Sequence, residues 1–155
     1  MTRRWKSISL IVCLCFISLA ALTACSGGYK VGDMYKRQGV VVAVDGQGMP
    51  TMLLALDEQA NLDADSAQRW AATLEQGWQL PSRDQWEQIR KQRTLINRTL
   101  ADKGLPLVAK GQTYYWSSTP CSATHYYACS PDGIRCFFHS NKSNSYRCRA
   151  VYVFE

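Results

Sequence analysis

The order of apolar and polar positions along the chain predicts strands, then helices, then strands again. Residues 39–44 form a β-branched run and residues 52–56 form a second apolar run. The turn-forming residues 45–50 between them predict an antiparallel hairpin. Further strands are predicted towards the C-terminus, with a tight turn at 132–133 and a polar loop at 140–145; these strands cover residues 113–118, 125–130, 134–139 and 146–154.

Two helices are predicted between these groups of strands. In each, a residue that favours the N-cap is followed three positions later by glutamine, as Asp65 is by Gln68 and Ser82 by Gln85. Apolar residues then recur at intervals of three and four, which gives each helix one buried face that includes Trp70 or Trp86. The helices end at Gly77 and by Gly104. Segregated strands and helices predict an α+β fold in which two helices pack on a mostly antiparallel sheet.

The first 25 residues have the pattern of an export signal. Residues 1–7 are polar and basic, and residues 8–22 form an apolar stretch that is short for a membrane span but typical of a signal peptide. Residues 22–25 read LTAC and resemble the bacterial lipobox, a cleavage site that ends in an acylated cysteine. The resemblance implies cleavage before Cys25 and acyl chains on Cys25 that hold the protein to a membrane.

This cleavage divides the chain and changes its charge. We expect a lipoprotein signal peptide over 1–24, a lipid-anchored tether over 25–31 and one domain over 32–155. Three of the 18 basic residues lie in the first six positions, so 15 remain against 12 acidic residues, with no basic cluster to bind nucleic acid. Ser26 after the lipidated cysteine fits sorting to the outer membrane, and it leaves open whether the domain faces the periplasm or the outside.

The cysteines that remain after cleavage predict two disulfides, because an even number in an exported domain is typical of oxidised pairs. The turn at 132–133 places Cys129 opposite Cys136, and the following loop places Cys136 opposite Cys148. If Cys136 pairs with Cys148, the other two cysteines, Cys121 and Cys129, lie at the ends of a short segment that can close on itself. We therefore predict Cys121–Cys129 and Cys136–Cys148, and the pairing of Cys129 with Cys136 stays open as the alternative.

Three stretches resemble bacterial C-type-lectin-like domains: GWQLPSRDQW at 77–86, YWSST at 115–119 and YRCRAV at 146–151. Such domains occur at the C-terminus of collagen-like bacterial adhesins and in lipoproteins of gut anaerobes, and formylglycine-generating enzymes share the wider fold. The resemblance covers residues 39–154. It implies a compact fold whose N- and C-terminal strands pair, with two helices on one side and Trp116 in the core.

Most of the chemistry known on this fold is not expected here. His125 and His139 with the neighbouring cysteines match no compact zinc spacing, and the residues beyond Cys121 hold too few carboxylates for calcium. No serine–histidine–acid order, paired-carboxylate motif or phosphate-binding glycine loop stands out. A mature chain of 131 residues, 155 less 24, is much smaller than the formylglycine-generating enzymes. We therefore expect no enzyme activity, no metal and no cofactor.

A binding surface is the remaining expectation. The loop at 140–145 is rich in Asn and Ser and lies near aromatic residues, a composition that suits adaptable recognition and is also found in solvated loops. We predict that a ligand contacts Tyr126, Tyr127, Phe137, Asn141 and Asn144. The expected function is that of a lipid-anchored cell-envelope protein that binds a glycan or a protein. The alternative is a structural component of an outer-membrane complex.

Overall fold

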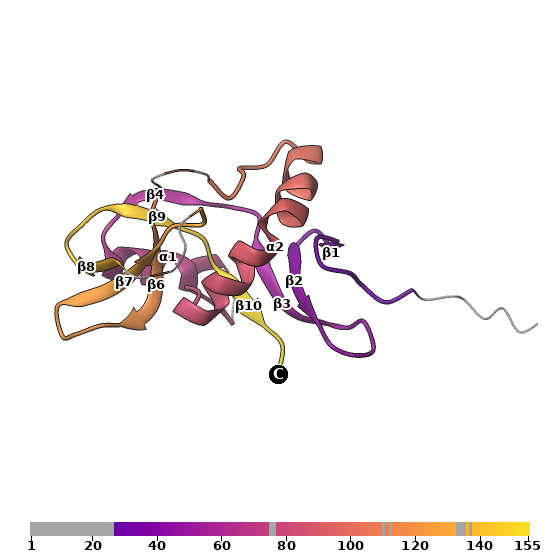
Figure 1. Ribbon diagram of the computed structural model, residues 1–155, viewed down its shortest axis with the longest axis horizontal. Coiled ribbons are helices and arrows are strands. Elements are labelled where there is room, and N and C mark those ends of the chain that lie inside the picture. The colour runs from indigo at the N-terminus through magenta and orange to yellow at the C-terminus, as the bar shows by residue number, and fades with distance from the viewer. Residues whose placement is uncertain (1–26, 75–76, 110, 112, 133–135, 137) are drawn as a thin grey trace, which may run out of the picture.

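The computed structural model describes residues 27–155 apart from 75–76, 110, 112, 133–135 and 137. The described chain forms two helices, α1 (Ala64–Leu74) and α2 (Arg83–Asp102), and two five-stranded sheets. All strand pairs given for these residues are antiparallel except one (Figure 1). The α+β class is therefore confirmed. The expected signal peptide and Cys25 lie outside the described residues and stay predictions.

The first sheet is built around the predicted N-terminal hairpin. Its strands, in spatial order, are β1 (Met34–Tyr35), β2 (Gly39–Val44), β3 (Pro50–Ala55), β10 (Val151–Val153) and β5 (Trp78–Gln79). The resemblance implied that the first and last strands pair. The last strand pairs instead with the second strand of the hairpin, because Val151 lies opposite Leu54.

The second sheet holds most of the C-terminal strands. In spatial order it contains β4 (Gln59–Leu62), β9 (Tyr146–Cys148), β6 (Tyr115–Pro120), β7 (His125–Cys129) and β8 (Phe138–Asn141). The prediction of one strand over 146–154 is wrong, because β9 and β10 belong to different sheets. Arg149 and Ala150, both fully buried, carry the chain from one sheet to the other.

The helix starts were predicted correctly in one case and wrongly in the other. At α2 the predicted capping box is present: Ser82 Oγ accepts from Gln85 N at 3.2 Å, and Gln85 Oε1 accepts from Ser82 N at 2.7 Å. At α1 the cap is Asp63, whose Oδ1 accepts from Ser66 N at 2.8 Å. Asp65 lies inside the first turn, because the amide that needs an acceptor belongs to the residue three positions after Asp63.

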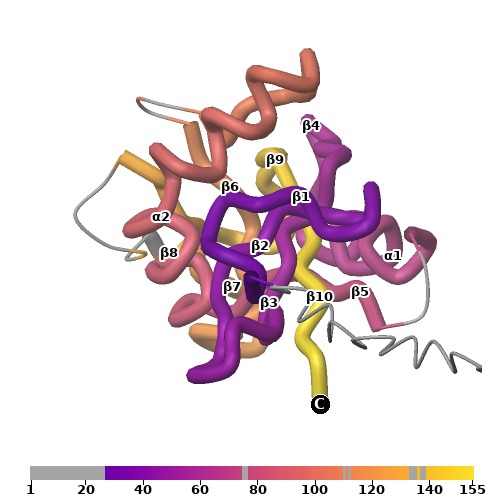
Figure 2. The backbone as a smooth tube through the Cα atoms, turned by 90° about the vertical axis from the view of Figure 1, so that its right-hand side faces the viewer, coloured from indigo at the N-terminus to yellow at the C-terminus, as the bar shows by residue number. Residues whose placement is uncertain are grey.

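The core consists of two clusters, one packed under α2 and one packed against α1. Under α2, Trp86 packs with apolar residues of β2, β3 and β10. The second cluster contains Trp116 and Cys148 of the second sheet together with Ala64, Ala67 and Ala71 of α1, and Figure 2 shows α1 on the other side of the molecule from α2. Trp86 and Trp116 are fully buried, as predicted, and Trp86 Nε1 donates to Trp116 O at 3.0 Å. Trp70 was also expected on a buried helix face, but its side chain is only partly buried at the margin of the second cluster.

The predicted disulfide pairing is wrong. The structure joins Cys129 to Cys136, whose Cα atoms are 4.1 Å apart, and leaves Cys121 and Cys148 as free thiols. Cys136 cannot reach Cys148, because β6 and β7 lie between β8 and β9 in the second sheet. The two strands were expected to be neighbours, and this assumption caused the error. Part of the predicted strand at 134–139 lies outside the described residues, and β8 begins at Phe138.

Candidate functional site

A cleft of about 560 Å³ opens at one end of the second sheet. Three segments that are far apart in the sequence form its walls: the start of α1, the loop between β6 and β7, and the turn between β8 and β9. We call it the α1 cleft. It is lined by Asp63, Asp65, Arg69, Ala123, Thr124, Asn141, Lys142 and Ser143.

Backbone hydrogen bonds through Lys142 fix these walls to one another. Lys142 N donates to Thr124 O at 3.0 Å, and Lys142 O accepts from Ala64 N at 3.0 Å. The side chain of Lys142 also contributes, because its Nζ lies 4.8 Å from the centre of the Tyr126 ring. A single residue thus connects all three segments.

The groups that line the cleft are almost all able to form hydrogen bonds. Hydrogen bonds from Ser66, first from its backbone N–H and then from its hydroxyl, lower the pKa of Asp63 below its usual value of 3.8. Arg69 Nη2 donates to Ser66 Oγ at 2.9 Å on the same helix. Asn141 Oδ1 accepts from both the backbone and the hydroxyl of Ser143, at 3.0 and 2.9 Å. The lining therefore combines carboxylates, cations, an amide and hydroxyls.

The structure brings three of the predicted binding residues to this cleft. Asn141 lines it, and Tyr126 lies beside it under Lys142. Asn144 supports the turn, because its Nδ2 donates to Ser140 Oγ at 2.7 Å. The loop is therefore more tightly bonded than its composition suggested.

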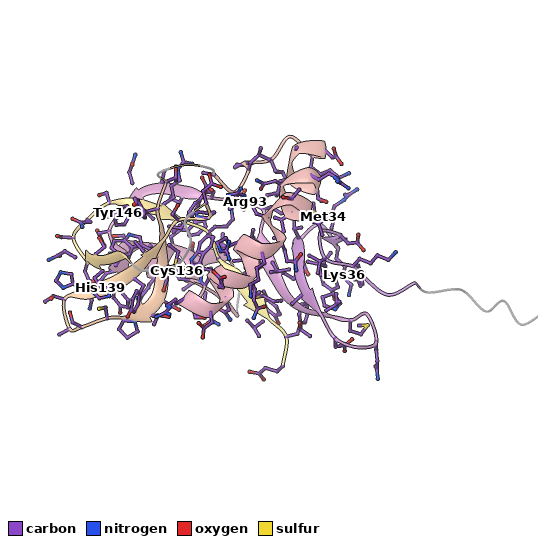
Figure 3. The ribbon with its side chains drawn as sticks, viewed as in Figure 1. Met34, Lys36, Arg93, Cys136, His139 and Tyr146 are labelled. Atoms are coloured by element: carbon purple, nitrogen blue, oxygen red, sulfur yellow. A yellow bond between two sulfur atoms is a disulfide. The ribbon has the colours of Figure 1, made fainter. Side chains whose placement is uncertain are left out.

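The other two predicted residues are not placed there. Tyr127 follows Tyr126 on β7, and successive strand residues point to opposite faces of a sheet. The Tyr127 ring contacts the His139 ring at 5.1 Å and the Arg83 guanidinium carbon at 5.3 Å. Figure 3 shows His139 on the outer part of the second sheet. Phe137 lies outside the described residues.

Sequence reasoning missed most of the cleft. Asp63, Asp65 and Arg69 are about 70–80 residues away from the loop that was singled out. No motif joins them to it, because only the sheet order and the hydrogen bonds of Lys142 bring the segments together. Thr124 had no local signal either, since it is one of several polar residues in an ordinary strand connection.

A second group of charged side chains lies at the junction of the two sheets. Glu58 accepts from the Tyr115 hydroxyl at 2.6 Å, pairs with Arg147, and lies 3.4 Å from Arg149 Nη2. Arg149 is fully buried and also donates to Pro106 O at 2.6 Å. Burial lowers the pKa of Arg149 and raises that of Tyr115. The position of Arg149 between β9 and β10 gives this group a structural role in holding the sheets together.

Comparison with known proteins adds no relative: no protein-family model matches the chain, and no curated protein is significantly similar to it. In the part of the chain that the structure describes, no three His, Cys, Asp or Glu side chains are grouped closely enough to hold a metal ion. Neither α1 nor α2 is both long and apolar enough to cross a bilayer. The functional argument therefore depends on the α1 cleft and on the N-terminal sequence.

Proposed function

We propose that this protein is a lipid-anchored component of the cell envelope whose C-type-lectin-like domain binds a glycan in the α1 cleft. The cleft carries the proposal, because its volume lies in the range of small-ligand sites. Its lining suits a molecule covered with hydroxyl groups: Asp65 accepts, Arg69 and Lys142 donate, and Thr124 and Ser143 do both. The preformed walls lower the entropy cost of binding.

Asp63 is poorly suited to act as the general acid of a glycosidase. Hydrolysis of a glycosidic bond requires a carboxylic acid that stays protonated, which means a raised pKa. Asp63 has the opposite shift, because its oxygens accept hydrogen bonds from Ser66. Asp65 is then the one further carboxylate among the lining residues named for this cleft.

The anchor and the lectin-like relationship are supported by different observations. Residues 8–25 have the apolar core and the LTAC ending that the lipoprotein reading requires. The relationship to C-type-lectin-like domains is supported by the three sequence stretches that resemble them and by two helices packed with mostly antiparallel sheets. Acyl chains on Cys25 would hold the domain at the membrane, and Ser26 favours the outer membrane.

Binding of the mature, acylated protein in detergent micelles to a glycan array tests the glycan function. We expect selective binding that Asp65→Asn weakens by about 10-fold or more, because a hydrogen bond to a charged group contributes about 1.5–3 kcal/mol. Asp102→Asn is the matched control, since Asp102 is exposed at the end of α2 and away from the cleft residues. Its affinity should equal that of the wild type.

Two results would contradict this proposal. Glycan binding that Asp65→Asn leaves unchanged would remove the cleft from the function. A stoichiometric protein that co-purifies in place of any glycan would favour a protein ligand or a structural role in an outer-membrane complex. The anchor has its own test: Cys25→Ser should block processing or release the protein from membranes, and an unmodified N-terminus downstream of Cys25 would refute it.

A further inference from the structure

A continuous row of aromatic side chains lies on the first sheet, at the other end of the molecule from the α1 cleft. Its rings contact one another in sequence, with centroid separations of 5.1, 5.4, 4.9 and 5.8 Å. Every member is partly exposed. We call this row the aromatic face; in spatial order it consists of Tyr29, Tyr35, Phe154, Tyr152 and Trp78.

The aromatic face covers the side of the first sheet that α2 does not. Val41, Leu53 and Tyr152 are register partners and therefore point to the same side. Their neighbours Val40 and Leu54 point to the other side, into the cluster under α2. In Figure 2 the strands β1, β2, β3 and β10 lie next to one another, with α1 and α2 to either side. The apolar residues beneath the rings are buried, whereas the rings themselves remain partly open to solvent.

Two basic residues stand at the edge of this face in a turn that their side chains do not favour. Gln38 N donates to Tyr35 O at 2.8 Å, which closes a β-turn with Lys36 and Arg37 at its centre. Both have a positive φ, 45° and 61°, which is the backbone of a turn that favours Asn-Gly. Lys36 Nζ lies 5.0 Å from the Tyr35 ring, and Figure 3 shows Lys36 at the end of the molecule where the described chain begins. A function for the charges would account for their presence at a strained position.

The start of the described chain is fixed beside the aromatic face. Tyr29 N donates to Gly48 O at 2.8 Å. Gly28 packs on Gly48 so closely that a Cβ added to Gly28 would lie 2.7 Å from the Gly48 Cα. Cys25 is three residues before Gly28, so an extended chain between them spans at most about 11 Å. Met49, next to Gly48, exposes 54 % of its surface at the same place.

We propose that the aromatic face, with the Lys36–Arg37 turn at its edge, rests on the anionic surface of the bilayer that holds the acyl chains of Cys25. This inference rests on the proposed lipid anchor. Tyrosine and tryptophan favour the membrane interface, where the ring is buried and the polar atom stays hydrated. Each basic side chain near an anionic surface increases partitioning by about fivefold.

The short connection favours the bilayer over a protein partner. A single helix is about 10–12 Å across, which already equals the whole reach of the chain between Cys25 and Gly28. A second copy or another protein on the aromatic face would have to fit between the domain and the membrane. Lipid headgroups occupy that space without any further component, because the interfacial layer is about 5–7 Å thick on each side.

Quenching of tryptophan fluorescence by nitroxide-labelled lipid headgroups tests this contact. The full chain is expressed, processed, and reconstituted in vesicles of phosphatidylethanolamine and phosphatidylglycerol. We expect quenching that Trp78→Phe removes and Trp70→Phe retains, because both indoles are partly exposed but only Trp78 belongs to the aromatic face. Vesicles without phosphatidylglycerol should show weaker quenching.

A second variant separates membrane contact from folding. Lys36→Asn with Arg37→Gly places the favoured residues in the turn, so the melting temperature should stay the same or rise. The same change removes two cations and should lower the ratio of docked to undocked protein by up to about 25-fold, at about fivefold for each. A lower melting temperature with unchanged quenching would mean that the two residues serve only the fold, and it would overturn their proposed role.

The remaining outcomes distinguish the face from the anchor. A protein that sediments with the vesicles but shows no headgroup quenching would overturn the membrane contact and leave the anchor intact. A protein that is found unacylated in the soluble fraction would overturn the anchor itself. Absence of headgroup quenching, together with a crosslink that joins two copies through the aromatic face, would assign that face to a second copy and overturn the membrane contact.

Discussion

Replacement of Glu58 by glutamine is the sharpest test of how the two sheets are joined. The amide keeps an acceptor for the Tyr115 hydroxyl but removes the negative charge that faces Arg147 and Arg149. The Glu58 side chain is only 5 % exposed and that of Arg149 is fully buried. The substitution therefore leaves a buried guanidinium without a counter-charge, while Arg147, whose side chain is 45 % exposed, can still be hydrated.

The expected loss of stability follows from this burial. Removing one partner of a buried ion pair costs about 3–5 kcal/mol, because the remaining charge cannot recover its hydration. The entropy of unfolding for a domain of about 130 residues is about 0.27 kcal/mol per kelvin, so Glu58→Gln should lower the melting temperature by about 11–18 °C. Replacing both charges, as Glu58→Gln with Arg149→Met, should recover part of this loss, because no unpaired ion remains buried.

The assay is urea and thermal unfolding followed by circular dichroism. The control is a glutamate-to-glutamine substitution in an ion pair at the surface. Glu87 bonds to Arg90 one turn along α2, and both side chains are about one-third exposed, so Glu87→Gln should cost about 0–1 kcal/mol. A loss at Glu58 no larger than the loss at Glu87 would show that Arg149 is hydrated in solution. A double variant less stable than Glu58→Gln alone would refute the unpaired charge as the cause.

Three further predictions concern the core, the first helix and the thiols. Trp86→Ala should cost about 3–5 kcal/mol in urea unfolding, and Trp70→Ala clearly less, because only Trp86 is fully buried; equal losses would contradict this difference. The pKa of Asp63 is lower in the folded state than its usual value of 3.8 in the unfolded chain. Its contribution to the free energy of unfolding is therefore fully present above pH 3.8 and is lost as the pH falls through the folded-state pKa. Melting curves of Asp63→Ala should therefore depend less on pH in that range than those of the wild type. Burial raises the pKa of Cys148 to about 12, so at pH 8 iodoacetamide should label the partly exposed Cys121 in the folded protein and Cys148 only in urea; rapid labelling of both would place Cys148 at the surface.

Local pattern was enough to predict much of this fold. The β-branched run at 39–44 forms β2 with the same limits, and the Ser82–Gln85 box starts α2. Both depend on neighbours within a few residues. The strand over 146–154 could not be divided correctly, because nothing in YRCRAV shows that the chain changes sheets at Arg149. The strands β1 and β5, with two residues each, gave no recognisable alternation.

The candidate site was predicted only in part for the same reason. The composition of the loop at 140–145 identified Asn141, which does line the α1 cleft. The opposite wall, with Asp63 and Asp65, is brought there by the backbone of Lys142, an interaction that no spacing in the sequence encodes. Tyr127 was included because it is near in sequence, although the alternation of a strand sends it to the other face. Long-range pairing decided each of these outcomes.

The place of β10 in the first sheet sets the order in which the domain can be completed. Residues 151–153 lie between β3 and β5, strands that are translated about 70–100 residues earlier, so the first sheet stays open until the final strand has been synthesised. Pairings between such distant segments form slowly, because the entropy of closing the intervening chain must be overcome first. For a chain that crosses a membrane in the unfolded state, this delay is useful. Under the proposed export, it would keep the polypeptide extended during translocation and postpone folding to a compartment where Cys129 and Cys136 can be oxidised.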